Sequence, residues 1–182
     1  MGGLTCIALL RGINVGGHKI IRMDALRKSC EALGLESVQT YLQSGNVIFK
    51  APQQSPEVLA RTLERKILRS FGFPVVVILR SPEEMNRVIN HNPFLKAKGT
   101  DASRLHVAFL SRAPEKAALN ALEAFPAAPE QFQASGKEIY LHYPNGAGKA
   151  KLSNNALERV LSVSATTRNW NTVNKLCEMS LA

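Results

Sequence analysis

Apolar and polar residues follow one another along the chain in segments whose lengths and periods predict alternating strands and helices. Residues 4–10 form a short apolar run, typical of a buried strand. From Met23 to Leu33 the apolar residues recur three or four positions apart, which predicts a helix whose C-terminal cap lies near Gly34. The chain therefore begins with a strand, a glycine-containing loop and an amphipathic helix.

A hairpin, a second helix and a further strand complete the first half. Residues 38–42 and 46–49 are β-type runs separated by Gln43-Ser44-Gly45, a spacing typical of a tight hairpin. Ser55-Pro56-Glu57 combines a capping hydroxyl, a first-turn proline and an acidic residue, and so predicts a helix start. Residues 74–79 form another buried strand. The order strand-helix-strand-strand-helix-strand predicts a ferredoxin-like unit.

The second half repeats this order of elements. Ser81 and Glu84 have the spacing of a capping box and predict a helix that ends before Asn92. Residues 92–103 are polar and are the expected connection between halves. The elements expected next are a strand at 105–110, a helix at 114–125, a hairpin of 131–134 and 138–143, a helix at 152–161, a short strand near Val163 and a final helix around Val173, Leu176 and Cys177.

The predicted fold class is therefore α+β, with two tandem ferredoxin-like halves and an extra C-terminal helix. The expected divisions are residues 1–80 for the first half, 81–103 for a helix and connection, and 104–182 for the second half with the final helix. A chain of 182 residues that is 45% hydrophobic can bury a full core in either one or two such bodies.

Charge and cysteine usage narrow the class of partner and the compartment. The 23 basic and 14 acidic residues give a net charge of +9, spread through both halves. This favours an anionic partner, although a basic soluble protein without one has the same balance. The three cysteines lie in apolar patterns without a CxxC pair, as reduced core thiols do. With no secretory leader and no apolar run long enough for a bilayer, we expect a cytoplasmic protein with no membrane partner.

The loop after the first strand is the first candidate for a binding site. Arg11 offers a fork of donors for an anion, and Gly12 and Gly16 let the backbone approach a ligand closely. Similar combinations recur at Ser44-Gly45-Asn46 and at Arg168-Asn169-Trp170. Taken alone, the first loop is more often a structural strand exit. The three motifs together suggest a composite site.

The segment 144–151 has the most phosphate-like pattern. A strand precedes it, a helix follows it, and two glycines lie beside Lys149 and Lys151. Exposed N–H groups at the start of that helix would suit a phosphate. It is not a P-loop, because no glycine stands five residues before Gly148 and Ala150 occupies the position of the Mg²⁺-binding hydroxyl. Anion binding and a plain flexible loop remain equal alternatives.

Several other classes of site are disfavoured. The first glycine loop lacks the dinucleotide-binding spacing, and Leu42 breaks the frame that would make Ser44 a nucleophile elbow. The four histidines share no metal-ligand spacing, so we expect no metal ion and no cofactor. The stacking aromatics of RNA-recognition domains are missing from the strand at 4–10. Arginines recur every fourth residue from Arg61 to Arg69, which indicates a solvated helix face more often than a nucleic-acid contact.

Three segments, ALLRGINVGG at 8–17, TYLQSGN at 40–46 and TRNWNTV at 167–173, together resemble the DUF1697 family, bacterial proteins of unknown function. The resemblance covers essentially the whole chain. It implies an α+β fold with ferredoxin-like subdomains and no established activity, substrate or cofactor. The family pattern often has a serine where this chain has Ala150 after a lysine, which argues against a hydroxyl-dependent role there. The residues that match the pattern are Arg11, Gly12, Asn14, Gly16, Ser44, Gly45, Asn46, Arg168, Asn169 and Trp170.

The leading hypothesis is a binding protein for an anionic ligand, either a nucleotide-like small molecule or nucleic acid. The arginines and lysines would hold the anion, the asparagines would orient it, and Trp170 would stack on a base or, more commonly, pack in the core. One alternative is an enzyme acting on a small anionic substrate through Ser44 or a histidine; the other is a structural or interaction module. The proposed ligand-binding residues are Arg11, Gly12, Asn14, Gly16, Ser44, Gly45, Asn46, Lys149, Lys151, Arg168, Asn169 and Trp170.

Overall fold

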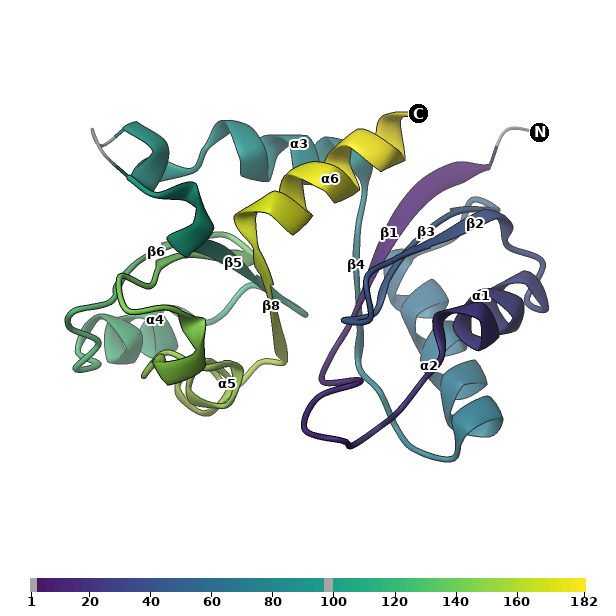
Figure 1. Ribbon diagram of the computed structural model, residues 1–182, viewed down its shortest axis with the longest axis horizontal. Helices are drawn as coiled ribbons and strands as arrows, with labels where there is room; N and C mark the ends of the chain where they lie inside the picture. The colour runs from purple at the N-terminus through teal and green to yellow at the C-terminus, as the bar shows by residue number, and fades with distance from the viewer. Residues whose placement is uncertain (1–2, 97–99) are drawn as a thin grey trace. The chain divides into compact units, whose positions relative to one another are not determined.

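The computed structural model describes residues 3–96 and 100–182. The chain divides into two compact units: unit 1 is Met1–Asn86 together with Leu176–Ala182, and unit 2 is Arg87–Lys175. The expected division placed the whole C-terminal helix with the second half, whereas the structure groups its last residues with unit 1. Each unit contains one four-stranded sheet, and Figure 1 labels most of the elements.

Unit 1 contains a ferredoxin-like βαββαβ arrangement. Its elements in chain order are β1 (Leu4–Leu10), α1 (Met23–Glu31), β2 (Glu36–Tyr41), β3 (Asn46–Ala51), α2 (Pro56–Phe71) and β4 (Val77–Arg80). The strands pair antiparallel in the order β2-β3-β1-β4. Both helices lie on one face of this sheet (Figure 1). This strand order confirms the predicted fold class for the first half.

Local sequence signals explain the helices of unit 1. The hydroxyl of Ser55 accepts a hydrogen bond from the N–H of Val58 at 3.3 Å and caps the start of α2. Gly72 ends the same helix in the left-handed conformation, with φ of 82°. Between these caps, Leu59, Leu63 and Ile67 recur at helical spacing and are buried against the sheet.

Unit 2 repeats the arrangement. Its elements are β5 (Leu105–Leu110), α4 (Lys116–Glu123), β6 (Gln131–Ser135), β7 (Glu138–His142), α5 (Asn154–Leu161) and β8 (Ala165–Asn169). The antiparallel order β6-β7-β5-β8 matches that of unit 1 element by element. The helix α6 (Trp170–Leu181) follows as the extra C-terminal element. The second half is therefore also ferredoxin-like, as predicted.

The connection between the sheets contains short helices. The helix α3 (Pro82–Asn90) begins with the predicted capping box: the N–H of Ser81 donates to Glu84 at 2.9 Å, and the N–H of Glu84 donates to the Ser81 hydroxyl at 3.1 Å. Two single-turn helices follow, η1 (Pro93–Lys96) and η2 (Ala102–Arg104); a third, η3 (Ala147–Lys149), precedes α5. Part of the expected connection, residues 97–99, lies outside the described residues.

Two strands differ from the prediction. The strand expected at 74–79 lies at Val77–Arg80; Pro74 has no N–H to donate to a strand ladder, and its carbonyl accepts from the Lys19 side chain at 2.8 Å. The last strand lies at Ala165–Asn169 and not near Val163, since Ser162 takes a left-handed conformation and ends α5. The third motif therefore lies on a strand and a helix start, and not in a loop.

Candidate functional site

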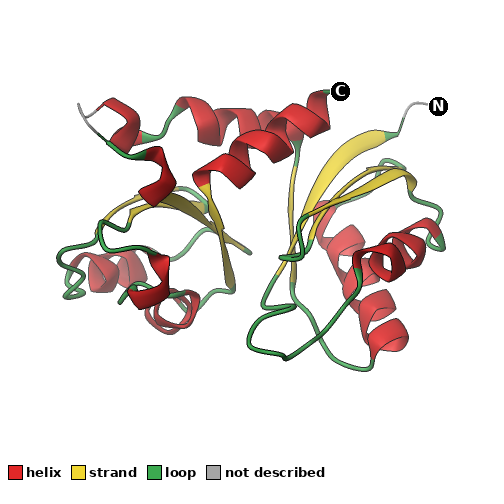
Figure 2. Cartoon of the chain, in the orientation of Figure 1, coloured by secondary structure: helices red, strands yellow, loops and turns green. Residues whose placement is uncertain are grey.

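The first two sequence motifs form one hydrogen-bonded structure at an end of the unit 1 sheet. Residues 11–22 make the long connection between β1 and α1, drawn as a loop in Figure 2, and Gln43-Ser44-Gly45 turns the β2–β3 hairpin. The N–H of Leu10 donates to the Gly45 carbonyl at 2.8 Å, and the side-chain amide of Asn14 donates to the Gln43 carbonyl at 2.7 Å. Segments about thirty residues apart in sequence are thus joined directly.

Gly45 is required by both conformation and packing. Its φ of +79° lies in the left-handed region that side chains rarely adopt. A Cβ placed there would lie 2.7 Å from the Ile13 Cδ1 atom and 2.8 Å from the Leu10 Cβ atom. The glycine therefore lets the hairpin turn pack closely on the residues that follow β1.

Asn14 shapes the loop through its side chain. It too has a positive φ, 54°, which asparagine tolerates better than most residues. Its amide oxygen accepts from the N–H of Ile21 at 2.8 Å, and its amide nitrogen donates to the carbonyls of Ile21 and Gln43 at 3.0 and 2.7 Å. Both ends of this amide are engaged within the protein, so Asn14 positions the loop and does not extend toward a ligand.

Asn46 has a similar structural role in the hairpin. Its side chain is fully buried and donates to the Tyr41 carbonyl at 2.7 Å and to the Ser44 hydroxyl at 3.0 Å. These two bonds hold the turn closed. Ser44 is exposed, with its hydroxyl oriented by Asn46.

The outer part of the first loop presents cations and glycine backbone. Arg11 is half-buried directly after β1, and its N–H donates to the Val76 carbonyl at 2.9 Å. Gly16 and Gly17 are exposed, with φ of 58° and 77°. The Lys19 ammonium donates a hydrogen bond to the Pro74 carbonyl at 2.8 Å. Residues 11–23 contain no aspartate or glutamate, so the loop is a locally basic surface.

The third motif is mostly buried within its own unit. Arg168, on β8, is 6% exposed; its guanidinium donates to the Thr166 hydroxyl at 2.8 Å, and burial lowers its pKa to about 10. Asn169 caps α6 by accepting from the N–H of Thr172 at 2.8 Å. Trp170 is buried at 5% exposure, as the core interpretation of this residue requires. This motif belongs to unit 2 and the first two to unit 1, so a site shared by all three stays a prediction.

A carboxylate of the protein binds the lysine segment at 144–151. The carboxylate of Glu130 accepts from the N–H groups of Lys151 and Leu152 at 2.6 and 2.8 Å. The Ser153 hydroxyl then caps α5, and the Lys151 ammonium donates to the Ala128 carbonyl at 2.6 Å. Three backbone donors at this helix start, the N–H groups of Lys151, Leu152 and Ala156, are therefore engaged by side chains of the protein.

The sequence pattern does not indicate one cation that lies beside this segment, Arg104. Gly146 lies under the guanidinium of Arg104, whose Nη1 atom would be 3.0 Å from a Cβ at position 146. Lys149 is exposed three residues further on. No spacing rule connects residue 104 with residue 146, because the two meet only through the pairing of β5 with β7.

The histidines of unit 2 do not form a catalytic pair. His106 lies opposite Leu141 and His142 opposite Leu105, so the alternation of a strand directs the two rings to opposite faces of the sheet. The His106 ring packs 5.0 Å from that of Tyr143, and the His142 ring lies 6.1 Å from that of Phe94. The geometry gives no support to a histidine dyad.

The cysteine thiols and the possible metal ligands do not form a reactive site in the part of the chain that the structure describes. Burial raises the pKa of the Cys30 thiol to about 12 and raises the pKa values of Cys6 and Cys177 as well. Across residues 3–96 and 100–182, no three His, Cys, Asp or Glu side chains gather closely enough to hold a metal ion. Over the same residues, no helix has the length and apolar content needed to cross a membrane.

Two sheets with the order β2-β3-β1-β4 and its repeat define a tandem ferredoxin-like α+β protein. Residues 4–140 match the family described as "Protein of unknown function (DUF1697)". The chain belongs to the DUF1697 family, as the three motifs suggested. A search of curated proteins gave no match.

One solved structure supports the fold over its full length. The conserved bacterial protein SP0830 from Streptococcus pneumoniae is 24% identical, with a TM-score of 0.77 over 97% of this chain and 98% of that one. At this level of identity the similarity concerns the fold alone.

Proposed function

We propose that this protein binds an anionic ligand, a nucleotide-like small molecule or nucleic acid, at the joined glycine loops of unit 1. The observation that carries the proposal is the hydrogen-bonded junction of the two loops, where Gly45 packs on Leu10 and Ile13 and Asn14 bonds to Gln43. Such a junction holds Arg11 and the exposed glycine backbone in a fixed arrangement. A preformed arrangement of donors binds an anion without an added cost of ordering the loop.

Arg11 is the principal cation in this proposal. A guanidinium can bind a phosphate or carboxylate through two parallel hydrogen bonds, which a lysine cannot do. The backbone at Gly16 and Gly17 is open to solvent, and the absence of acidic residues from 11 to 23 leaves the local charge positive. Lys149 and Arg168 belong to unit 2 and stay predictions on which this unit 1 site does not depend.

The polymer version has a specific observation in its favour. Arg61, Arg65 and Arg69 are exposed on α2, one turn apart, and none of their guanidinium groups makes an ion pair or hydrogen bond to another described residue. A row of unpaired arginines on one helix face has the spacing and charge to follow a phosphate backbone. In contrast, β1 and β3 carry no aromatic residue on the sheet face opposite the helices, so base stacking on this sheet is not part of the proposal.

Calorimetric titration of the purified protein tests the proposal. We expect binding of pyrophosphate or a nucleoside triphosphate at millimolar concentration, or of a single-stranded oligonucleotide at micromolar concentration. Arg11→Gln should weaken binding at least about tenfold if a charged bidentate contact is lost. Arg27→Gln, an exposed arginine on α1, is the matched control and should leave binding unchanged.

Two results would overturn the proposal. Either an equal loss of affinity in both variants or an absence of binding by all three probes would exclude the loops as an anion site. A loss of melting temperature in Arg11→Gln, with no effect of any anion on the wild-type protein, would favour the purely structural alternative.

A further inference from the structure

The strand β6 leaves one row of backbone groups without a partner. It stands at the edge of the unit 2 sheet, and its residues are mostly exposed. Ser135 pairs with Glu138 across a two-residue turn, so these residues exchange hydrogen bonds and the bonded pairs then alternate along the ladder. The backbone N–H and C=O groups of Phe132 and Ala134 therefore point away from β7. They make no hydrogen bond to any described residue.

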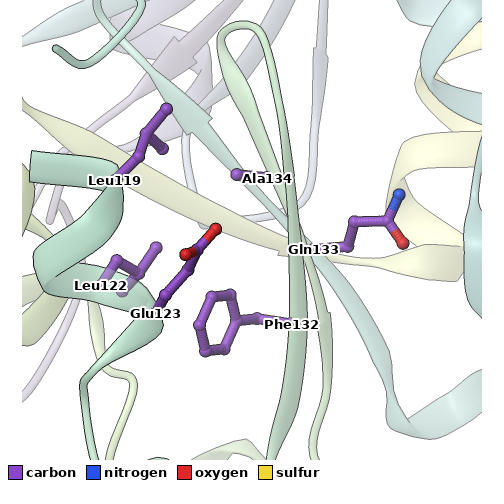
Figure 3. Close-up of a pocket in the computed structure, with 6 residues that line it drawn as sticks. All are labelled: Leu119, Leu122, Glu123, Phe132, Gln133 and Ala134. Atoms are coloured by element: carbon purple, nitrogen blue, oxygen red, sulfur yellow. The ribbon is translucent and has the colours of Figure 1, made fainter. Parts of the chain in front are cut away.

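A pocket lies between this strand and the helix α4. Its volume is about 370 Å³, within the range of small-ligand pockets. Three lining residues come from α4 and three from β6: Leu119, Leu122, Glu123, Phe132, Gln133 and Ala134. Figure 3 shows Phe132 and the helix side chains around a common space, while the Gln133 side chain points away from it.

The pocket combines apolar walls with one carboxylate. Leu119, Leu122 and Phe132 supply the walls, and the Glu123 carboxylate points into the space toward β6 (Figure 3). The Glu123 carboxylate makes no ion pair or hydrogen bond to any described residue, so its charge is available. An apolar stem with a cationic end is complementary to such a pocket, as a lysine or arginine side chain is.

We propose that β6 and the α4 pocket together bind an extended segment of a partner polypeptide that carries a lysine or arginine. The segment adds to the sheet as a strand beside β6 and bonds to the backbone of Phe132 and Ala134. Its basic side chain lies along Leu119 and Phe132 and places its cation beside Glu123. Backbone bonds supply affinity and the pocket supplies the preference for a basic residue, as in other cases of strand addition. This site is independent of the glycine loops of unit 1.

Fluorescence anisotropy with short labelled peptides tests the proposal. The probes are Thr-Val-Lys-Val-Thr, the same peptide with glutamate in place of lysine, and the lysine peptide with alternate backbone amides N-methylated. We expect saturable binding of the lysine peptide with a Kd below about 1 mM. The N-methylated peptide should bind at least about tenfold more weakly, because it lacks the strand hydrogen bonds.

Variants of the pocket complete the test. Glu123→Gln should weaken binding of the lysine peptide about two- to fivefold. Glu123→Lys should reverse the preference, so that the glutamate peptide binds more tightly. Glu115→Gln, at the other end of α4, is the matched control and should have no effect. Ala134→Pro removes an outward N–H of an edge strand and should abolish binding while the melting temperature is kept.

Several outcomes would overturn it. One is an absence of binding by the lysine peptide at concentrations up to about 1 mM. The others are equal binding of the N-methylated peptide and an unchanged peptide preference in Glu123→Lys. A wild-type dimer in sedimentation that becomes a monomer with Ala134→Pro would assign the edge to a second copy of this chain instead. If Ala134→Pro does not fold, the peptide pair and the Glu123 variants still decide the question.

Discussion

The glycine at position 45 links two properties that are usually separate: a left-handed backbone and a surface packed on its neighbours. Gly17 has nearly the same φ, 77°, but a Cβ there would meet no atom within 4 Å. The two positions therefore separate the cost of conformation from the cost of overlap. Residue-scale effects in this loop can be measured against each other within one protein.

Gly45→Ala should destabilise the protein more than Gly17→Ala does. The left-handed conformation alone costs about 1–2 kcal/mol for alanine, which both variants share. Overlap with Leu10 and Ile13 should add about 1–3 kcal/mol at position 45 only. Urea denaturation of the two variants measures the difference in the free energy of unfolding. Equal losses would show that overlap at position 45 is relieved without cost.

His106 provides a second prediction at this scale. Burial lowers its pKa from 6.5, and a hydrogen bond to the Arg104 carbonyl only partly opposes that shift. Because the folded-state pKa is the lower one, the stabilising contribution is fully present above pH 6.5 and is lost as the pH falls from there through the folded-state pKa. The His106 ring proton should titrate by NMR with a midpoint below 6.5. His106→Gln should flatten the decrease in stability with falling pH, whereas a midpoint above 6.5 would contradict the burial argument.

At the scale of elements, local signals in the sequence specify most helices. Ser55 and Gly72 bound α2, and the pair Ser81 and Glu84 begins α3, because each signal acts within one turn of the backbone. The strand β8 gave no such signal. Thr166, Thr167 and Arg168 are polar, although Thr166 and Arg168 are buried, so the sequence shows no apolar alternation along this strand.

The start of α5 depends on a contact that the sequence does not indicate. Glu130 lies more than twenty residues before the N–H groups that it accepts from, so no helix-start pattern includes it. Glu130→Ala should lower the free energy of unfolding by about 1–2 kcal/mol, since two N–H groups lose a charged acceptor. Thermal or urea denaturation measures the loss, with Glu115→Ala as the exposed control. A loss no larger than that of the control would show that solvent replaces the carboxylate fully.

At the scale of the whole molecule, the repeated order of elements predicted both ferredoxin-like units. The sequence predicted the candidate site less completely than the fold. The two glycine motifs of unit 1 do lie together. Nothing in their spacing shows that the side chains of Asn14 and Asn46 form hydrogen bonds within the protein. Likewise, Arg104 meets Gly146 only because β5 and β7 are neighbours. Contacts between distant segments depend on strand order, which a local pattern does not encode.

The net charge of +9 leads to a prediction about salt. If the polymer version of the proposed function holds, oligonucleotide affinity should fall steeply with salt, by about 0.7 in log–log slope for each phosphate contact on single strands. Replacing Arg61, Arg65 and Arg69 together by glutamine should lower that slope by about 2. Binding at a series of salt concentrations measures it. An unchanged slope in the triple variant would exclude α2 as the contact surface.

The close fit between the hairpin turn and the loop after β1 also limits how this protein can be re-engineered. Because residue 45 has space only for a hydrogen between Leu10 and Ile13, the two segments form a single module. A chimera that imports the hairpin of a relative without its first loop should fold poorly unless the side chains at positions 10 and 13 are exchanged with it. Loop grafting in this family should therefore transfer both segments as a pair.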